Sequence, residues 1–370
     1  MKIAMLGHKR IPSREGGIEI VVGELSQRMA AHGHTVCAYN RKSDHIAGEQ
    51  YEKINEYNGV RIKWVKTPNA SKLNAIVYSF FATVRAICGG YDILHYHAEG
   101  PAAMIPLAKL CGKKCVATIH GLDWQRAKWG GFATKFLKYG EKCAAKYADE
   151  VIVLSKNVQQ YFLATYGRET KYIPNGISAP EHIGAEILHE KYRLDKDGYL
   201  LFLGRLVPEK GVHYLIHAYQ TLDTDKKLVI AGGASHTNEY ERALHEMAGD
   251  NVIFTGFIQG DELGALYSNA YLYCLPSDLE GMPISLLEAM SYGCACLTSD
   301  IPECTEVCGE NAVYFQKGNE RDLAEKLAAL LADSATVERL RRDSAAYICD
   351  KFNWDEVTAK TLELYEGLLS

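Results

Sequence analysis

The sequence predicts two α/β domains, each with a parallel sheet covered by helices on both faces. Three observations lead to this fold class. The chain has 370 residues, and single hydrophobic cores seldom grow past ~250–300 residues. Short apolar runs alternate with longer helical stretches, the order that right-handed βαβ crossovers produce. This alternation stops at a turn-rich segment, residues 172–198, and then starts again.

The first series begins with an apolar run at residues 2–7, which has the length of a strand and ends in glycine. Residues 16–33 follow, with apolar side chains at helical spacing and Gly33 as a stop signal. The later runs are continuously apolar, as expected of strands buried on both faces of a sheet. These further predicted strands are residues 34–40, 59–65, 92–97, 114–120 and 149–155.

The second series follows Pro174-Asn175-Gly176, which we interpret as the connection between the domains. We therefore predict an amino-terminal domain at residues 1–175 and a carboxyl-terminal domain at residues 176–354. The final residues, 355–370, are predicted to form a helix that packs back onto the first domain. The predicted strands of the second domain are residues 199–205, 227–233, 251–257, 270–277, 294–299 and 311–316.

The composition argues against several classes of protein. The net charge is −5, so no basic field suggests a nucleic-acid binder. No apolar stretch reaches the ~18–20 residues that span a bilayer, and the amino-terminal apolar run is too short for a signal peptide. The cysteines, 11 in number, form no disulfide framework, which favours buried thiols in a reducing cytosol. We expect a cytoplasmic protein.

Ligands of open parallel sheets bind beyond the carboxyl ends of the strands, so the loops after the strands are the expected site. With two such domains facing each other, we expect the site in a cleft between them. Residues 204–211, GRLVPEKG, place Arg205 and Lys210 after the first strand of the second domain. A guanidinium and an ammonium at this position suit a diphosphate, whereas a solvated basic turn is the alternative interpretation.

Residues 277–293, SDLEGMPISLLEAMSYG, contain two glutamates around a Gly-Met-Pro turn. Pro283 suits the first turn of a helix, which leaves Glu280 in the loop and places Glu288 on an apolar helix. A carboxylate buried there needs partners. Ribose hydroxyls or nearby cations would supply them.

Two features of the first domain are weaker signals. Gly16-Gly17 lies where a loop becomes a helix, so backbone amides could approach an anion. A tight turn before the helix is the alternative, and the G-x-G-x-x-G fingerprint of dinucleotide binding is absent. His120 follows the fifth predicted strand and precedes Gly121, where it could contact a ligand or be a structural histidine.

Neither of two other pairs predicts a metal site. Asp223 and Asp225 precede a predicted strand and stand beside two lysines. Cys294 and Cys296 share one face of another predicted strand, where they are expected to pack. We therefore predict that the protein uses no metal and no cofactor.

Together these motifs resemble the retaining glycosyltransferases of glycosyltransferase family 4, which have the GT-B fold, over nearly the whole chain. The most specific element is the E-x7-E pattern of Glu280 and Glu288. GRLVPEKG matches the phosphate loop of the family, and IPNGI, residues 173–177, matches its crossing between domains. Residues 11–41 look like the branch that includes rhamnosyltransferases of bacterial capsule and wall polysaccharides. One departure is E-G-M-P-I-S, where many members have E-G-F-G-L-P.

The resemblance implies a hexosyltransferase that moves a sugar from a UDP- or dTDP-sugar to a glycan or lipid-linked acceptor in bacterial surface polysaccharide synthesis, without a metal. It implies that Arg205 and Lys210 bind the diphosphate, Glu288 the ribose, and Glu280 and His120 the sugar. The catalytic set implied is His120, Arg205, Lys210 and Glu280. The donor-binding set implied is Gly16, Gly17, Gly204, Arg205, Lys210, Glu280, Gly281, Met282, Pro283 and Glu288.

Two other functions stay open. A nucleotide-sugar 2-epimerase has the same fold but needs further acid and base groups around the sugar. The third hypothesis is a non-catalytic subunit that binds a nucleotide-sugar. The E-x7-E pattern points away from the epimerase, and the joint presence of the five polar site residues disfavours a subunit that has lost catalysis.

A basic segment raises the question of a membrane. Residues 109–146 carry nine lysines and arginines against two acids, and within them residues 124–142 interleave lysines with large apolar side chains. That composition is typical of a helix on an anionic membrane surface, although an ordinary solvated face would also account for it. A peripheral position at the inner face of the membrane would suit a lipid-linked acceptor.

Overall fold

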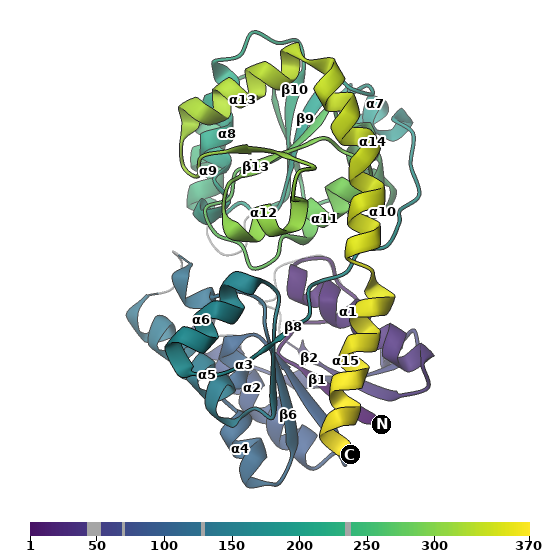
Figure 1. Cartoon of the computed structure of the whole chain (residues 1–370), viewed down its shortest axis with the longest axis vertical. Coiled ribbons are helices and arrows are strands. Elements are labelled where there is room, and N and C mark those ends of the chain that lie inside the picture. Colours follow the sequence, from purple (N-terminus) through teal and green to yellow (C-terminus); the bar gives the residue numbers. More distant parts are fainter. Residues whose placement is uncertain (43–52, 69–70, 127–129, 234–237) are drawn as a thin grey trace. The chain divides into compact units, whose positions relative to one another are not determined.

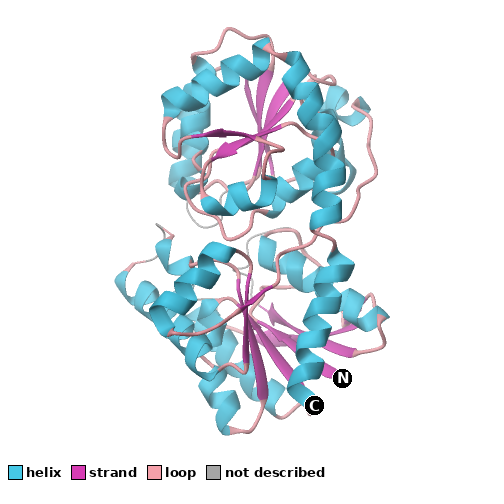
Figure 2. Ribbon diagram, in the orientation of Figure 1, coloured by secondary structure: helices cyan, strands magenta, loops and turns pink. Residues whose placement is uncertain are grey.

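The computed structural model describes residues 1–42, 53–68, 71–126, 130–233 and 238–370. The chain divides into two compact units, which are treated separately below. Unit 1 comprises Met1–Gly176 with Trp354–Ser370, and unit 2 comprises Ile177–Asn353. In both units helices pack around a central sheet (Figure 2). The predicted fold class, two α/β domains with mostly parallel sheets, is confirmed.

Unit 1 contains an eight-stranded sheet in the order β3-β4-β2-β1-β5-β6-β7-β8. Its strands are β1 (Lys2–Leu6), β2 (Thr35–Lys42), β3 (Glu56–Tyr57), β4 (Val60–Lys66), β5 (Ile93–His97), β6 (Lys114–Ile119), β7 (Glu150–Val153) and β8 (Lys171–Tyr172). The central strands are buried and apolar, as predicted. The sequence did not reveal β3 and β8, because strands of two residues contain no apolar run. β3 also pairs antiparallel with β4, so the sheet is not wholly parallel.

The helices of unit 1 include the last helix of the chain. They are α1 (Gly17–Ala31), α2 (Ser71–Ile87), α3 (Glu99–Ala102), α4 (Ile105–Leu110), α5 (Gly131–Tyr147), α6 (Lys156–Tyr166) and α15 (Trp354–Leu369), with a 3-10 turn at Asp123–Gln125. α15 lies beside α1 (Figure 1), where Arg28 Nε donates to Asp355 Oδ1 at 3.0 Å. A Cβ at Gly176 would lie 2.5 Å from the Trp354 ring, so the start of α15 requires glycine at that point of the chain.

Unit 2 contains a six-stranded parallel sheet in the order β11-β10-β9-β12-β13-β14. Its strands are β9 (Tyr199–Leu203), β10 (Lys227–Ala231), β11 (Val252–Gly256), β12 (Leu272–Leu275), β13 (Cys296–Ser299) and β14 (Val313–Phe315). The chain runs from β9 outward to β11 and then returns to β12 on the other side of β9. The loops after β9 and β12 therefore begin at the point where a doubly wound sheet binds its ligand.

Helices cover both faces of this second sheet (Figure 1). They are α7 (Glu186–Tyr192), α8 (Val212–Gln220), α9 (Asn238–Met247), α10 (Gly260–Asn269), α11 (Ile284–Ser291), α12 (Pro302–Cys308), α13 (Glu320–Ala332) and α14 (Ser334–Lys351), with a 3-10 turn at Pro208–Lys210. The described part of the chain contains no helix that is both long and apolar enough to cross a membrane.

Candidate active site

The loop after β9 holds the two predicted phosphate-binding cations. The backbone N–H of Gly204 donates to the carbonyl of Ala231 at 3.0 Å, which ties the start of the loop to the end of β10. Gly211 ends the loop at a φ of +66°, and a Cβ there would lie 2.0 Å from the Pro276 carbonyl oxygen. The two ends of the loop therefore contact the ends of β10 and β12, the strands on either side of β9. Arg205 and Lys210 are both partly exposed along it.

The loop after β12 brings Glu280 to Lys210. Lys210 Nζ donates to Glu280 Oε1 at 2.5 Å, and the hydroxyl of Ser277 donates to the same oxygen at 2.6 Å. The side chains of Lys210 and Glu280 are only 13% and 8% exposed, so the ion pair is largely shielded from water. The backbone N–H of Asp278 also donates to the carbonyl of Glu209 at 2.9 Å. Two loops some 70 residues apart in sequence thus form one polar surface.

Glu288 lies on α11 and is buried, with 8% of its surface exposed. The hydroxyl of Tyr267, on α10, donates to Glu288 Oε2 at 3.1 Å. Burial and then the charge of Glu288 raise the pKa of Tyr267 well above its ordinary value, so this tyrosine stays a donor. Protein groups therefore satisfy part of the carboxylate before any ribose binds. Pro283 is the N-cap residue of α11, one position before the first turn in which the sequence placed it, and Gly281 and Met282 are buried beside it.

His120 follows β6 in unit 1 and is 9% exposed. Its Nε2 lies 3.0 Å from Nδ1 of His97, the last residue of β5. Burial lowers the pKa of His120 to about 4, so the ring is neutral at pH 7. In a neutral state His120 can donate or accept a hydrogen bond but cannot supply a positive charge. His97 is not among the site residues predicted from the sequence, although in LHYH it alternates with His95 and so lies on the same face of the strand.

The Gly16-Gly17 turn has a local structural explanation. Gly16 caps α1 in an extended conformation, and Gly17 is the first residue of the helix. A Cβ at Gly16 would lie 2.5 Å from Oε2 of Glu19, whose Oε1 accepts the backbone N–H of Lys9 at 2.8 Å. Glu19 is 6% exposed, and its charge acts on His8 and on His120. No pattern in the sequence points to this buried acid, which lies beside the loop after β1.

Residues 124–142, the segment proposed to lie on a membrane surface, are divided between the 3-10 turn Asp123–Gln125 and helix α5. Trp124 belongs to the 3-10 turn, and its Nε1 donates to the buried Glu141 at 2.9 Å, while Lys138 Nζ lies 4.1 Å from the Trp124 ring centroid. Phe132 and Tyr139 on α5 are 75% and 55% exposed. Trp129 lies outside the described residues. The outer face of α5 is thus basic with aromatic side chains, while the partly exposed Trp124 donates to Glu141 and has Lys138 over its ring.

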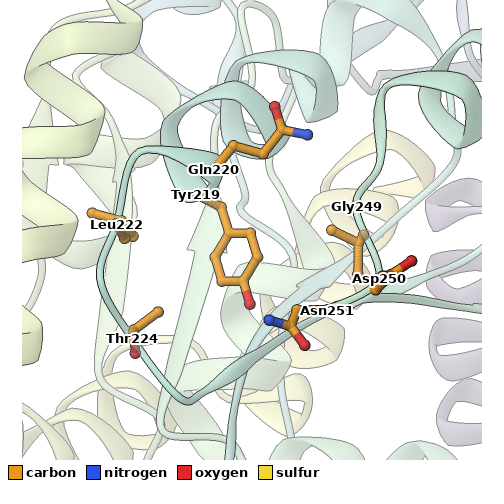
Figure 3. A pocket seen from close by; sticks show the side chains of 8 residues that line it. Tyr219, Gln220, Leu222, Thr224, Gly249, Asp250 and Asn251 are labelled. Atoms are coloured by element: carbon orange, nitrogen blue, oxygen red, sulfur yellow. The ribbon is translucent and has the colours of Figure 1, made fainter.

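Three further features lie away from these loops. A hollow of about 300 Å³ lies at the amino ends of β10 and β11, the opposite edge of the sheet from Arg205 and Glu280. Figure 3 shows the side chains that line it. It is lined by Tyr219, Gln220, Leu222, Thr224, Gly249, Asp250, Asn251 and Val252. Cys294 and Cys296 are buried in the core, and burial raises the pKa of each thiol. No group of three His, Cys, Asp or Glu side chains in the described ranges could hold a metal ion.

Two family models match the chain. Residues 15–179 match the model described as Glycosyltransferase Family 4, and residues 185–347 match Glycosyl transferases group 1. An uncharacterized glycosyltransferase of Methanocaldococcus jannaschii is 26% identical, over 99% of this chain and 98% of that protein. A GDP-mannose-dependent α-(1-6)-phosphatidylinositol monomannoside mannosyltransferase of Mycobacterium tuberculosis is 24% identical, over 99% of each.

Solved structures share the fold. HepE of Anabaena, in complex with UDP and glucose, superposes with a TM-score of 0.83 at 18% identity, over 99% of this chain and all of that one. The two matched models cover different parts of the chain, residues 15–179 and residues 185–347. The chain is therefore a glycosyltransferase of the GT-B fold, with residues 15–179 similar to Glycosyltransferase Family 4 and residues 185–347 similar to Glycosyl transferases group 1.

Proposed function

We propose that the protein transfers a hexose from a nucleoside diphosphate-sugar to a glycan or lipid-linked acceptor, with retention of configuration, in the synthesis of a bacterial surface polysaccharide. The observation that carries this proposal is the shielded Lys210–Glu280 pair, which joins the loops at the carboxyl ends of β9 and β12. A cation paired with an acid at that edge suits a ligand that presents both phosphate oxygens and hydroxyl groups.

Each polar residue then has a separate role. Arg205 and Lys210 bind the diphosphate, and Glu288 accepts a hydrogen bond from a ribose hydroxyl. When Lys210 turns to the diphosphate, its partner Glu280 is released to accept hydrogen bonds from sugar hydroxyls. The backbone of Gly204 and residues 281–283 line the same site. In unit 1, His120 and the Gly16-Gly17 turn are the proposed ligand contacts of that unit.

The chemistry follows from the charges. Cleavage of the anomeric C–O bond leaves positive character on the sugar and an additional negative charge on the diphosphate. Arg205 and Lys210 stabilise that leaving group, which is the largest contribution expected from fixed cations. The acceptor hydroxyl attacks from the same face, and a leaving phosphate oxygen takes its proton. This route requires neither a protein nucleophile nor a metal.

The donor is tested first. UDP, dTDP, GDP and ADP and their common sugars are compared by thermal shift with and without EDTA. A ligand at ~100 times its dissociation constant adds ~2.7 kcal/mol of stability. The family resemblance favours a UDP- or dTDP-sugar, while the mycobacterial relative is named for GDP-mannose. A shift with a single nucleotide series identifies the donor class.

Turnover is tested next. We expect Arg205→Ala and Lys210→Ala each to lower acceptor-dependent release of nucleotide by at least ~100-fold, the scale for one lost transition-state donor. The exposed Lys196, which lies before β9 begins, provides the control variant Lys196→Ala. Near-normal rates in both Arg205→Ala and Lys210→Ala would refute the proposal that these residues stabilise the diphosphate. Binding of the donor without acceptor-dependent release would favour the epimerase or the non-catalytic subunit.

We further propose that the outer face of α5 holds the protein at the inner face of the membrane. Lys135, Lys142 and Lys146 are exposed on α5 together with Phe132, and each basic side chain near an anionic surface contributes ~1 kcal/mol. We expect Lys135→Glu/Lys142→Glu to release the protein from anionic liposomes. The matched control is Lys196→Glu/Lys317→Glu, which makes the same charge change in unit 2. Equal binding by wild type and both variants would exclude this surface.

A further inference from the structure

Three buried histidines lie at the carboxyl ends of β5 and β6. His95 and His97 alternate on β5 with ring centroids 4.1 Å apart, and Nδ1 of His97 lies 3.0 Å from Nε2 of His120. His95 and His97 are fully buried, whereas His120 is 9% exposed. His120 is therefore the member of the cluster that a ligand can reach.

The ring nitrogens of the cluster differ in their partners. His95 uses both, with Nε2 at 2.7 Å from the Thr118 hydroxyl and Nδ1 at 2.6 Å from the Tyr365 hydroxyl on α15. His97 Nε2 is buried and has no hydrogen-bond partner among the described residues. His120 is bonded through Nε2, and none of the described hydrogen bonds uses its Nδ1.

The position of one proton decides what His120 offers to a ligand. Burial lowers the pKa of His97 well below its ordinary value and that of His120 to about 4, so both rings are neutral at pH 7. If His120 donated to His97, the proton of His97 would be on its buried Nε2, where no acceptor is present. If His97 donates from Nδ1, its Nε2 is a bare lone pair. In proteins a buried N–H group without an acceptor is rarer than a buried acceptor without a donor. This difference favours donation from Nδ1 of His97.

We infer that His97 is a positioning residue that donates from Nδ1 to Nε2 of His120 and thereby holds the proton of His120 on Nδ1. The accessible nitrogen of His120 is then a hydrogen-bond donor rather than an acceptor. Its consequence for catalysis rests on the proposed function: the Nδ1–H of His120 donates to an oxygen of the ligand that it binds. The position of the proton, in contrast, is a property of unit 1 alone.

The decisive measurement is the nitrogen-15 NMR spectrum of the full-length protein labelled in its histidines, at pH 7. Protonated and bare ring nitrogens have well-separated shifts, and the His120 signals are assigned by their loss in His120→Asn. We expect a protonated Nδ1 and a bare Nε2. A proton on Nε2 of His120 would overturn the inference, whatever the enzymatic activity.

Two variants of His97 link the proton to turnover. In His97→Asn the amide nitrogen can replace the Nδ1 donor, so we expect the His120 signals and kcat to stay near wild type. His97→Phe keeps the ring volume but has no donor, and we expect a His120 proton shared between both nitrogens. Its kcat should fall by about 10-fold, the lower end for a lost orienting partner, with a smaller change in the donor KM.

A purely structural role gives a different pattern. If His97 only fills space, His97→Phe keeps the His120 signals and kcat, and His97→Asn is no better than His97→Phe; either result refutes the inference. Thermal midpoints of both variants show whether unit 1 still folds. If wild type transfers no sugar from any donor tested, the proposed function fails, while the wild-type spectrum still decides the position of the proton.

Discussion

Replacing Lys210 by methionine tests the structural description of the candidate site without any substrate. The change removes the ammonium but keeps most of the side-chain length. Glu280, 8% exposed, then keeps the hydroxyl of Ser277 as a partner but loses its counter-charge. Breaking a buried ion pair from one side costs 3–5 kcal/mol. Because the serine bond remains, we expect the lower end, about 3 kcal/mol of the free energy of unfolding.

The location of the four tryptophans allows the unfolding of the two units to be distinguished. All four, Trp64, Trp124, Trp129 and Trp354, belong to unit 1. Urea unfolding followed by tryptophan fluorescence therefore reports unit 1, while far-UV circular dichroism reports both units. With a slope of about 2 kcal/mol/M, Lys210→Met should lower the unit 2 midpoint by about 1.5 M. The fluorescence transition should move less.

A double-mutant cycle separates the pair from its surroundings. Glu280→Gln should cost less than Lys210→Met, because the flexible lysine can reach water while the shorter acid side chain cannot. The double variant should cost less than the sum, with a coupling of at least about 1 kcal/mol. Additive losses, within ~0.5 kcal/mol, would show that the two groups do not interact and would refute the geometry on which the proposed function rests.

The remaining predictions address three other positions. Gly211→Ala would force a φ of +66° on alanine and set its Cβ 2.0 Å from the Pro276 carbonyl; we expect a loss of at least ~1–3 kcal/mol, against less than ~0.5 kcal/mol for the unobstructed Gly249→Ala, both by urea unfolding. Glu288→Ala should weaken nucleotide binding by roughly 1–3 kcal/mol in calorimetry, and Tyr267→Phe by less, since Tyr267 only orients the acid; equal affinities in wild type and Glu288→Ala would count against the ribose contact. Burial, and then the charges of Asp123 and Glu141, raise the pKa of Glu99 above its ordinary 4.5. The folded protein therefore holds a proton on Glu99 that the unfolded chain releases above that pH, so Glu99 lowers stability as the pH rises. Glu99→Gln should raise the thermal midpoint at pH 8 more than at pH 4, and an equal effect at both values would contradict this account.

The positions of the candidate loops relative to strand ends could be read from the chain itself. Continuous apolar runs identify strands buried on both faces, and GRLVPEKG follows one such run while EGMP follows another. Hydrophobic pattern and turn chemistry report local conformation, so they locate loops but carry little information about which loops meet. Short edge strands such as β3 and β8 lack that pattern, because their pairing comes from neighbours and not from their own residues.

Local patterns in the chain indicate the class of fold, the order of its elements and the presence of cations and acids at the carboxyl ends of particular strands. The partners appear only in the folded molecule: Lys210 with Glu280 across β9 and β12, Tyr267 with Glu288, His97 with His120, and Trp124 with Glu141. The physical reason is that strand order and helix packing set these pairs. Both depend on contacts between residues distant in the chain, which no local pattern records.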